Sequence, residues 1–144
     1  MKFEETVSFM LTKATIAHRN LLESTVKQIG LHSGQVFLLF ELWKQDGQRQ
    51  VDLAGRMKLS PPTVNKILGG LLESDLVTRA RYEDDARSTR IFLTEKGREI
   101  RGALEIKWAE LEGETLAPLT ETESLLLQQL LTKMLSLGVD EDDY

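Results

Sequence analysis

Apolar residues recur at helical spacing along most of the chain. From Phe3 to about Ile29 they follow one another at intervals of three and four, which places them on one stripe of a helix. The members of this stripe are Phe3, Val7, Met10, Ala14, Ala17 and Leu21. Gly30 is expected to end this helix. The next predicted helix starts at His32 or Ser33 and ends at Asp46-Gly47. It is apolar nearly all round, which predicts that it is the buried central helix of the fold.

Two short helices with a tight turn between them are predicted from Val51 to Asp75. The predicted inward face of the first helix is Val51, Leu53, Ala54 and Met57. The second helix has Ser60 as its N-cap and Pro61 at its first position, where the missing N–H costs nothing. Its predicted inward face is Val64, Ile67, Leu68, Leu71 and Leu72. Lys58 occupies the turn, where Gly or Asn would suit a left-handed backbone.

The pattern then changes from helical spacing to short alternating runs. Val77–Arg81 and Thr89–Leu93 are predicted as two strands joined by an acidic and then basic loop, which makes a hairpin. Thr94 is expected to cap a long helix whose apolar side is Ile100, Leu104, Trp108 and Leu111. Pro118 breaks this helix, and Thr120 with Glu123 forms the capping box of a last helix that ends near Gly138.

This order of elements predicts a mainly α protein with a small β-hairpin wing, folded as one domain over residues 1–144. Residues of about 31–98 form a winged helix-turn-helix, and residues of about 1–30 and 99–138 form flanking helices. The acidic tail, residues 139–144, is expected to be disordered. Since burying one leucine stabilises a fold by about 1.5–3 kcal/mol, the apolar stripes of the flanking helices predict that a second copy of the chain covers them in a homodimer.

Composition narrows the possible functions. The 144-residue chain has no cysteine, which excludes disulfides, thiolate zinc sites and thiol redox switches. Its acidic start and its lack of long apolar runs predict a cytoplasmic protein. We find no Ser/His/Asp spacing, no phosphate loop and no paired carboxylates with an evident cleft, so neither an enzyme nor a cofactor is expected. The net charge is −5, yet residues 49–101 carry 11 Lys+Arg against 8 Asp+Glu, a balance of +3. A basic middle segment is typical of proteins that bind a polyanion.

The second helix of the helix-turn-helix provides the candidate base contacts. Its predicted exposed positions are Ser60, Pro62, Thr63, Asn65 and Lys66. Thr63 offers a hydroxyl and a methyl group, Asn65 can pair bidentately with adenine, and Lys66 can contact a phosphate or a guanine edge. The alternative is a capped surface helix with ordinary polar side chains.

The hairpin provides candidate contacts beside that helix. Arg87 at its tip is predicted to enter a minor groove, where negative potential is strongest, and Asp85 can accept from its guanidinium group. Arg79, Arg81 and Arg90 on the strands would contact flanking phosphates. The alternative is a solvated turn whose charges neutralise one another, because exposed ion pairs stabilise little.

The stretches "LHSGQVFLLFELW", "VDLAGRMKLSPPTVNKIL" and "LLESDLVTRARYEDDARSTRIFLTEKG" resemble the MarR (multiple antibiotic resistance regulator) family. The most specific part is the wing pattern Asp-x-Arg followed by an alternating run to Leu-Thr, here Asp85, Arg87, Leu93 and Thr94. The resemblance implies a dimeric winged-helix transcriptional regulator, commonly a repressor, that binds a pseudo-palindromic operator in double-stranded DNA. It also assigns DNA contacts to Arg87 and to residues 60–66. Gly69 and Gly70 depart from an ordinary recognition helix and cost about 1 kcal/mol each relative to alanine.

Many members of that family are released from DNA by small aromatic or anionic effectors that bind between the dimerisation helices and the winged domain. Here that junction would draw on His18, Arg19, Phe40, Trp43 and Trp108. An arginine or histidine beside aromatic rings suits an aromatic carboxylate. The alternative is that the aromatic residues are plain core and His18 a surface residue. With two histidines and no cysteine, no metal site is expected.

A winged-helix protein-interaction module without specific DNA binding is the competing function. Salt dependence separates the two, because DNA binding through several phosphates weakens steeply as salt rises.

Arg87→Ala is predicted to weaken binding to every DNA sequence and to reduce the salt slope by about 1, because its role is a phosphate or minor-groove contact. Titration of the variant against duplex DNA at several salt concentrations checks this. An unchanged affinity and footprint would reject the assignment of Arg87.

Overall fold

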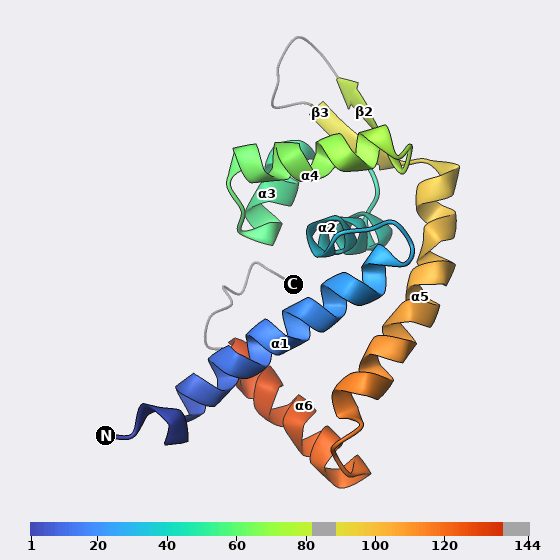
Figure 1. The fold of residues 1–144 in the computed structure, drawn as a ribbon. Coiled ribbons are helices and arrows are strands. Elements are labelled where there is room, and N and C mark those ends of the chain that lie inside the picture. Colours follow the sequence, from blue (N-terminus) through green and yellow to red (C-terminus); the bar gives the residue numbers. More distant parts are fainter. Residues whose placement is uncertain (82–88, 137–144) are drawn as a thin grey trace.

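The computed structural model describes residues 1–81 and 89–136. The elements along the chain are η1 (Phe3–Glu5), α1 (Val7–Lys27), α2 (Ser33–Lys44), β1 (Gln48–Arg49), α3 (Gln50–Met57), α4 (Pro61–Glu73), β2 (Val77–Arg81), β3 (Thr89–Leu93), α5 (Glu95–Leu116) and α6 (Glu121–Ser136). Figure 1 shows α2, α3, α4 and the sheet grouped together, with α1, α5 and α6 extending away from them. The predicted fold class, mainly α with a small β wing, is confirmed. Asp85, Arg87 and the acidic tail lie outside the described residues.

The sheet has three antiparallel strands in the order β1-β3-β2. Strands β2 and β3 have the predicted bounds, and their register pairs Val77 with Leu93, Arg79 with Ile91 and Arg81 with Thr89. Strand β1 was not predicted; it adds only two residues, which pair Gln48 with Ile91 and Arg49 with Arg90. A two-residue strand carries no detectable alternation, so only the pairing with β3 identifies it.

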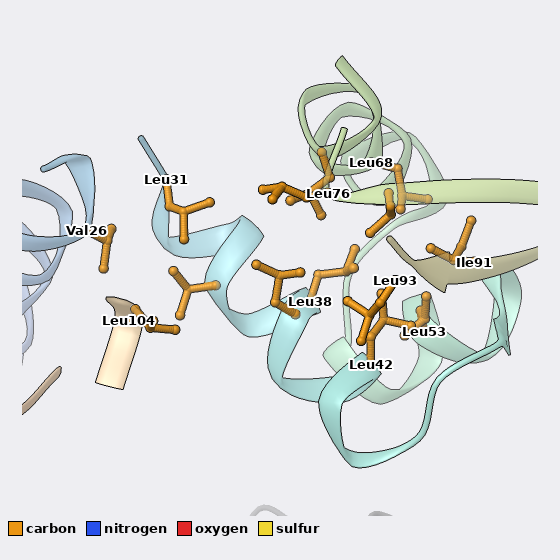
Figure 2. Packing of buried hydrophobic residues seen from close by; sticks show 14 of the residues in the cluster. Val26, Leu31, Leu38, Leu42, Leu53, Leu68, Leu76, Ile91, Leu93 and Leu104 are labelled. Atoms are coloured by element: carbon orange, nitrogen blue, oxygen red, sulfur yellow. The ribbon is translucent and has the colours of Figure 1, made fainter. Parts of the chain in front are cut away.

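One apolar core joins the winged part to the outer helices. Figure 2 shows Leu38 and Leu42 of α2 facing Leu53, Leu68 and Ile91, all of them essentially inaccessible to water. The core continues toward α1 and α5 through Val26, Leu31 and Leu104. The predicted burial of α2 is therefore confirmed, and this helix is the centre on which the other elements pack.

Two predicted positions differ in the structure. Val51 was placed on the inward face of α3, but 49% of it is exposed, whereas Leu53 is fully buried. Two residues span about 200° of a helix, so Val51 and Leu53 lie on opposite sides. The first helix was predicted to begin at Phe3, but Phe3 belongs to the 3-10 turn η1 and α1 begins at Val7. The hydroxyl oxygen of Thr6 accepts from the backbone N–H of Phe9 and sets this start.

Three helices end in the same way, with one residue in the left-handed conformation. Gly30, Lys58 and Asp75 have φ values of 78°, 54° and 58°. After each one, the next residue donates its N–H back to the helix: Leu31 to Val26, Leu59 to Ala54 and Leu76 to Leu71. This is the Schellman arrangement, in which an apolar residue after the turn packs back on the helix.

The first turn of α5 is pressed against the connection between α4 and β2. A Cβ atom added to Gly97 would lie 2.0 Å from the carbonyl oxygen of Leu76. The same oxygen accepts from the N–H of Thr94, and the indole Nε1 of Trp43 donates to the carbonyl of Gly97 at 3.0 Å. The predicted cap is confirmed, since Thr94 accepts from the N–H of Gly97 at 2.9 Å. Only glycine fits at position 97.

The outer helices leave much apolar surface uncovered in one chain. Helix α6 begins with the predicted reciprocal capping box of Thr120 and Glu123, and it has no buried residue. Its exposed apolar residues are Leu125, Leu126, Leu127, Leu130, Leu131, Met134 and Leu135. On η1 and α1 the exposed ones include Phe3, Val7, Phe9, Met10, Leu11 and Ile16. Within the described residues no helix is both long and apolar enough to cross a bilayer.

Gly97→Ala is predicted to lower the free energy of unfolding by about 3 kcal/mol, because the new methyl group displaces α5 from the Leu76 carbonyl. Gly102→Ala on the same helix is the matched control, since a Cβ atom there meets nothing within 4 Å. It should be neutral or stabilising by about 0.5–1 kcal/mol. Urea denaturation of both variants measures the difference, and equal stabilities would contradict the close contact.

Candidate nucleic-acid interface

Helix α4 turns a polar surface away from the core. Its buried residues are Val64, Leu68 and Leu71. The five predicted contact residues are all exposed; they are Ser60, Pro62, Thr63, Asn65 and Lys66. Ser60 is the N-cap, as predicted, and its hydroxyl lies 2.9 Å from that of Thr63. No acidic residue occupies the first turn. The start of the helix therefore presents its positive dipole end together with hydroxyl, amide and ammonium groups.

The turn before α4 sets the angle between α3 and α4. Lys58, in its left-handed conformation, donates its N–H to Gly55, and Leu59 donates to Ala54. Leu59 and Ala54 are both half-buried against the core. The left-handed backbone at Lys58 agrees with the sequence analysis, in which this position favoured Gly or Asn.

Gln50, which was not among the predicted site residues, contacts one of them. It is the first residue of α3 and is half-buried. Its amide nitrogen Nε2 donates to Oδ1 of Asn65 on α4. No sequence signal could reveal this pair, because residues 50 and 65 meet only when the helix-turn-helix has folded.

The strand arginines do not share one face of the sheet. Residues paired across antiparallel strands lie on the same face, so Arg79 and Arg81 share a face with Ile91 and Thr89. Arg90 lies on the opposite face, where its Nη1 donates to the carbonyl of Gly47 at 2.9 Å. All three arginines are exposed. All three were predicted to contact flanking phosphates, whereas the structure places them on two different faces of the sheet.

Three arginines surround Asp52 at the start of α3. Arg49 donates to both carboxylate oxygens of Asp52, at 2.9 and 3.1 Å. This hydrogen bond, with smaller contributions from the charges of Arg56 and Arg90, holds the pKa of Asp52 below its usual value. Arg56 also donates to the side-chain oxygen of Gln48. Three arginines around one carboxylate leave the cluster positively charged, so α3 adds to the basic surface.

Three of the five predicted effector residues lie together. The ring centroid of Phe40 is 5.9 Å from that of Trp43 and 5.3 Å from that of Trp108. These rings are half-buried against the core. The guanidinium group of Arg101 lies 5.8 Å from the Trp43 ring centroid. His18 and Arg19 are exposed on α1. Arg101, which the sequence analysis did not single out, is thus a cation positioned on the aromatic cluster.

The two adjacent glycines inside α4 have different surroundings. A Cβ atom on Gly70 would lie 2.5 Å from the side-chain nitrogen of Gln35, whereas one on Gly69 would meet nothing within 4 Å. Gly70 therefore leaves room for the side-chain amide of Gln35 on α2, whereas Gly69 faces open space. In residues 1–81 and 89–136 no group of three or more His, Asp or Glu side chains could hold a metal ion.

The chain is similar in sequence and structure to bacterial regulators. The MarR family model matches residues 31–89. The HTH-type transcriptional regulator TtmR of Methylorubrum extorquens (strain PA1) is 34% identical over 92 residues, which cover 64% of this chain and 47% of TtmR. The chain spans about half the length of the curated relatives it matches.

Among solved structures, MepR of S. aureus in its DNA complex is 28% identical, with a TM-score of 0.75 and coverage of 91% of this chain and 97% of MepR. BpsR of Bordetella bronchiseptica is 23% identical, with a TM-score of 0.80 and coverage of 90% and 98%. The winged-helix fold is therefore shared over nearly the whole chain.

Lys58→Gly is predicted to raise the free energy of unfolding by about 0.5–1 kcal/mol, because glycine adopts the left-handed conformation without steric cost. Lys66→Gly, which makes the same replacement inside α4, should instead lower it by about 1 kcal/mol. Thermal or urea unfolding measures both. A loss of stability in Lys58→Gly as large as in Lys66→Gly would contradict the left-handed turn.

Proposed function

We propose that this chain, which belongs to the MarR family, is a homodimeric, sequence-specific DNA-binding transcriptional regulator. The observation that carries the proposal is the exposed polar start of α4. The opposite side of this helix is buried through Val64, Leu68 and Leu71, and the hydrogen-bonded turn before it connects it to α3. This is the geometry by which a helix-turn-helix presents the N-terminal residues of its second helix to the major groove. The structure of MepR is of a DNA complex, and its likeness in sequence and fold supports the same use of α4 here.

The charge distribution supports this interface. Residues 49–101 have a balance of +3 in a chain of net charge −5. Within them, Lys66 lies on α4, Arg79 and Arg81 on β2, Arg49 on β1 and Arg56 on α3. Positive charge on the segment that carries α4 attracts DNA over several ångströms and supplies the part of the affinity that does not depend on sequence.

The exposed apolar surface of α1 and α6 supports the homodimer. Leu135 is 65% exposed, Leu125 60% and Val7 73%. These residues lie on helices that extend away from the winged part (Figure 1). Many exposed apolar residues on one pair of helices are typical of an interface between subunits. A two-fold axis through these helices gives two copies of α4, which can enter successive major grooves about one helical turn apart on a pseudo-palindromic site.

A small aromatic or anionic effector is proposed as the regulator of DNA binding, with repression as the mode of control. The specific support is the cluster of Phe40, Trp43 and Trp108 with the Arg101 cation beside it. A cation against aromatic rings suits an aromatic carboxylate better than the exposed pair His18 and Arg19. BpsR, which has the same fold, is a protein whose DNA binding is regulated by 6-hydroxynicotinic acid.

DNA binding is tested by selecting bound duplexes from a random pool and then measuring affinity for the enriched sequence from 50 to 200 mM salt. We expect two half-sites with centres about 10 base pairs apart. We also expect a loss of affinity of about 1,000-fold or more over this range, as for six or more phosphate contacts.

Light scattering at the concentrations used for binding should show two chains per particle. The interaction-module function would be favoured if the protein enriched no DNA sequence and its affinity for DNA did not fall steadily as the salt concentration rises. A stable monomer that still protects two half-sites would contradict the proposed dimer.

A further inference from the structure

A side-chain hydrogen bond between Gln50 and Asn65 links α3 to the exposed surface of α4. Gln50 Nε2 donates to Asn65 Oδ1 across 15 residues of sequence. Asn65 is exposed, and Gln50 is half-buried at the start of α3. The pair therefore lies at the edge of the surface proposed to contact DNA.

Stability does not explain this pair. The contact between α3 and α4 is already made by buried apolar side chains, among them Leu53 and Val64, both fully inaccessible. Two neutral amides at the surface exchange one hydrogen bond for others with water, so the net stabilisation is small. An exposed asparagine without a partner, however, rotates freely and presents either its oxygen or its nitrogen outward.

We propose that Gln50 is a positioning residue that fixes the amide of Asn65 and so sets base preference at one position of each half-site. The inference rests on the proposed DNA-binding function. Because Oδ1 of Asn65 accepts from Gln50, the amide is held with Oδ1 toward Gln50 and with Nδ2, which has no other protein partner among the described residues, turned away from it. Nδ2 carries two protons and only donates.

A fixed donor distinguishes bases by their major-groove edges. Guanine presents N7 and O6, adenine N7 and thymine O4, all of which accept, whereas cytosine presents only its N4 donor. Asn65 held in this way therefore disfavours cytosine on the contacted strand. An asparagine free to rotate would accept from cytosine N4 as readily as it donates to the other bases, and the discrimination would be lost.

Two substitutions at position 50 test the orientation in opposite directions. Gln50→Leu keeps the approximate size and removes the hydrogen bond, so discrimination against cytosine should fall by about fivefold or more. Gln50→Glu provides only acceptor oxygens, which require Asn65 to donate with Nδ2 and to turn Oδ1 outward. Its preference should shift toward cytosine and adenine, whose N4 and N6 amino groups donate.

The measurement is the relative affinity for the four bases at each position of the selected site, for the wild-type dimer and each variant. Any uniform weakening by the added charge of Gln50→Glu cancels in these ratios. Asn65→Ala should flatten the same position that Gln50→Leu flattens, and Val51→Ala, an exposed neighbour on α3, should leave every position unchanged. Circular dichroism melts of each variant establish that it is folded.

The outcomes separate the two levels of the proposal. A wild-type protein that enriches no site at all would overturn the proposed function. A wild-type site with unchanged base ratios in both Gln50 variants would overturn the positioning role of Gln50 and leave DNA binding standing. Flattening in Gln50→Leu without a shift toward cytosine and adenine in Gln50→Glu would overturn the assigned orientation of the Asn65 amide.

Discussion

The close contact at Gly97 is the constraint on which the arrangement of this molecule depends. It is the point where α5 leaves the sheet, and it brings together the Leu76 carbonyl, the Thr94 N–H and the Trp43 indole. Because Leu76 ends the connection from α4 and Thr94 follows β3, one contact ties α4, the sheet and α5 together. Any side chain at position 97 would separate them. The direction in which α5 leaves the sheet follows from this contact.

On the surface proposed to bind DNA, buried and exposed residues have separate roles. Buried residues of α3 and α4 fix the two helix axes, and the Schellman turn at Lys58 fixes the angle between them. The exposed residues are then free to serve recognition. Lys66 and the arginines of α3 and β2 provide positive charge that would attract DNA of any sequence. The hydrogen-bonded pair of Gln50 and Asn65 is instead suited to discriminate between bases.

The aromatic cluster of Phe40, Trp43 and Trp108 lies where α2 packs against α5. Trp43 belongs to α2 and donates to Gly97 of α5, and its ring packs near Phe40, which also packs against Trp108 of α5. The rings therefore belong to the core where α2 meets α5. Arg101, one turn after Gly97, places its guanidinium group 5.8 Å from the centroid of the Trp43 ring.

The sequence by itself determined the elements and their order, because helical spacing, alternation and caps are local. Thr94 and Thr120 as caps, the bounds of β2 and β3, and the inward faces of α4 and α5 were all predicted from neighbouring residues. Tertiary structure alone decided β1 and the opposite faces of Arg79 and Arg90, since each depends on which strand lies alongside. The pairs Gln50–Asn65 and Trp43–Gly97 belong to the same class. They join residues 15 and 54 positions apart, and no local pattern encodes a contact that exists only after the core has brought the two segments together.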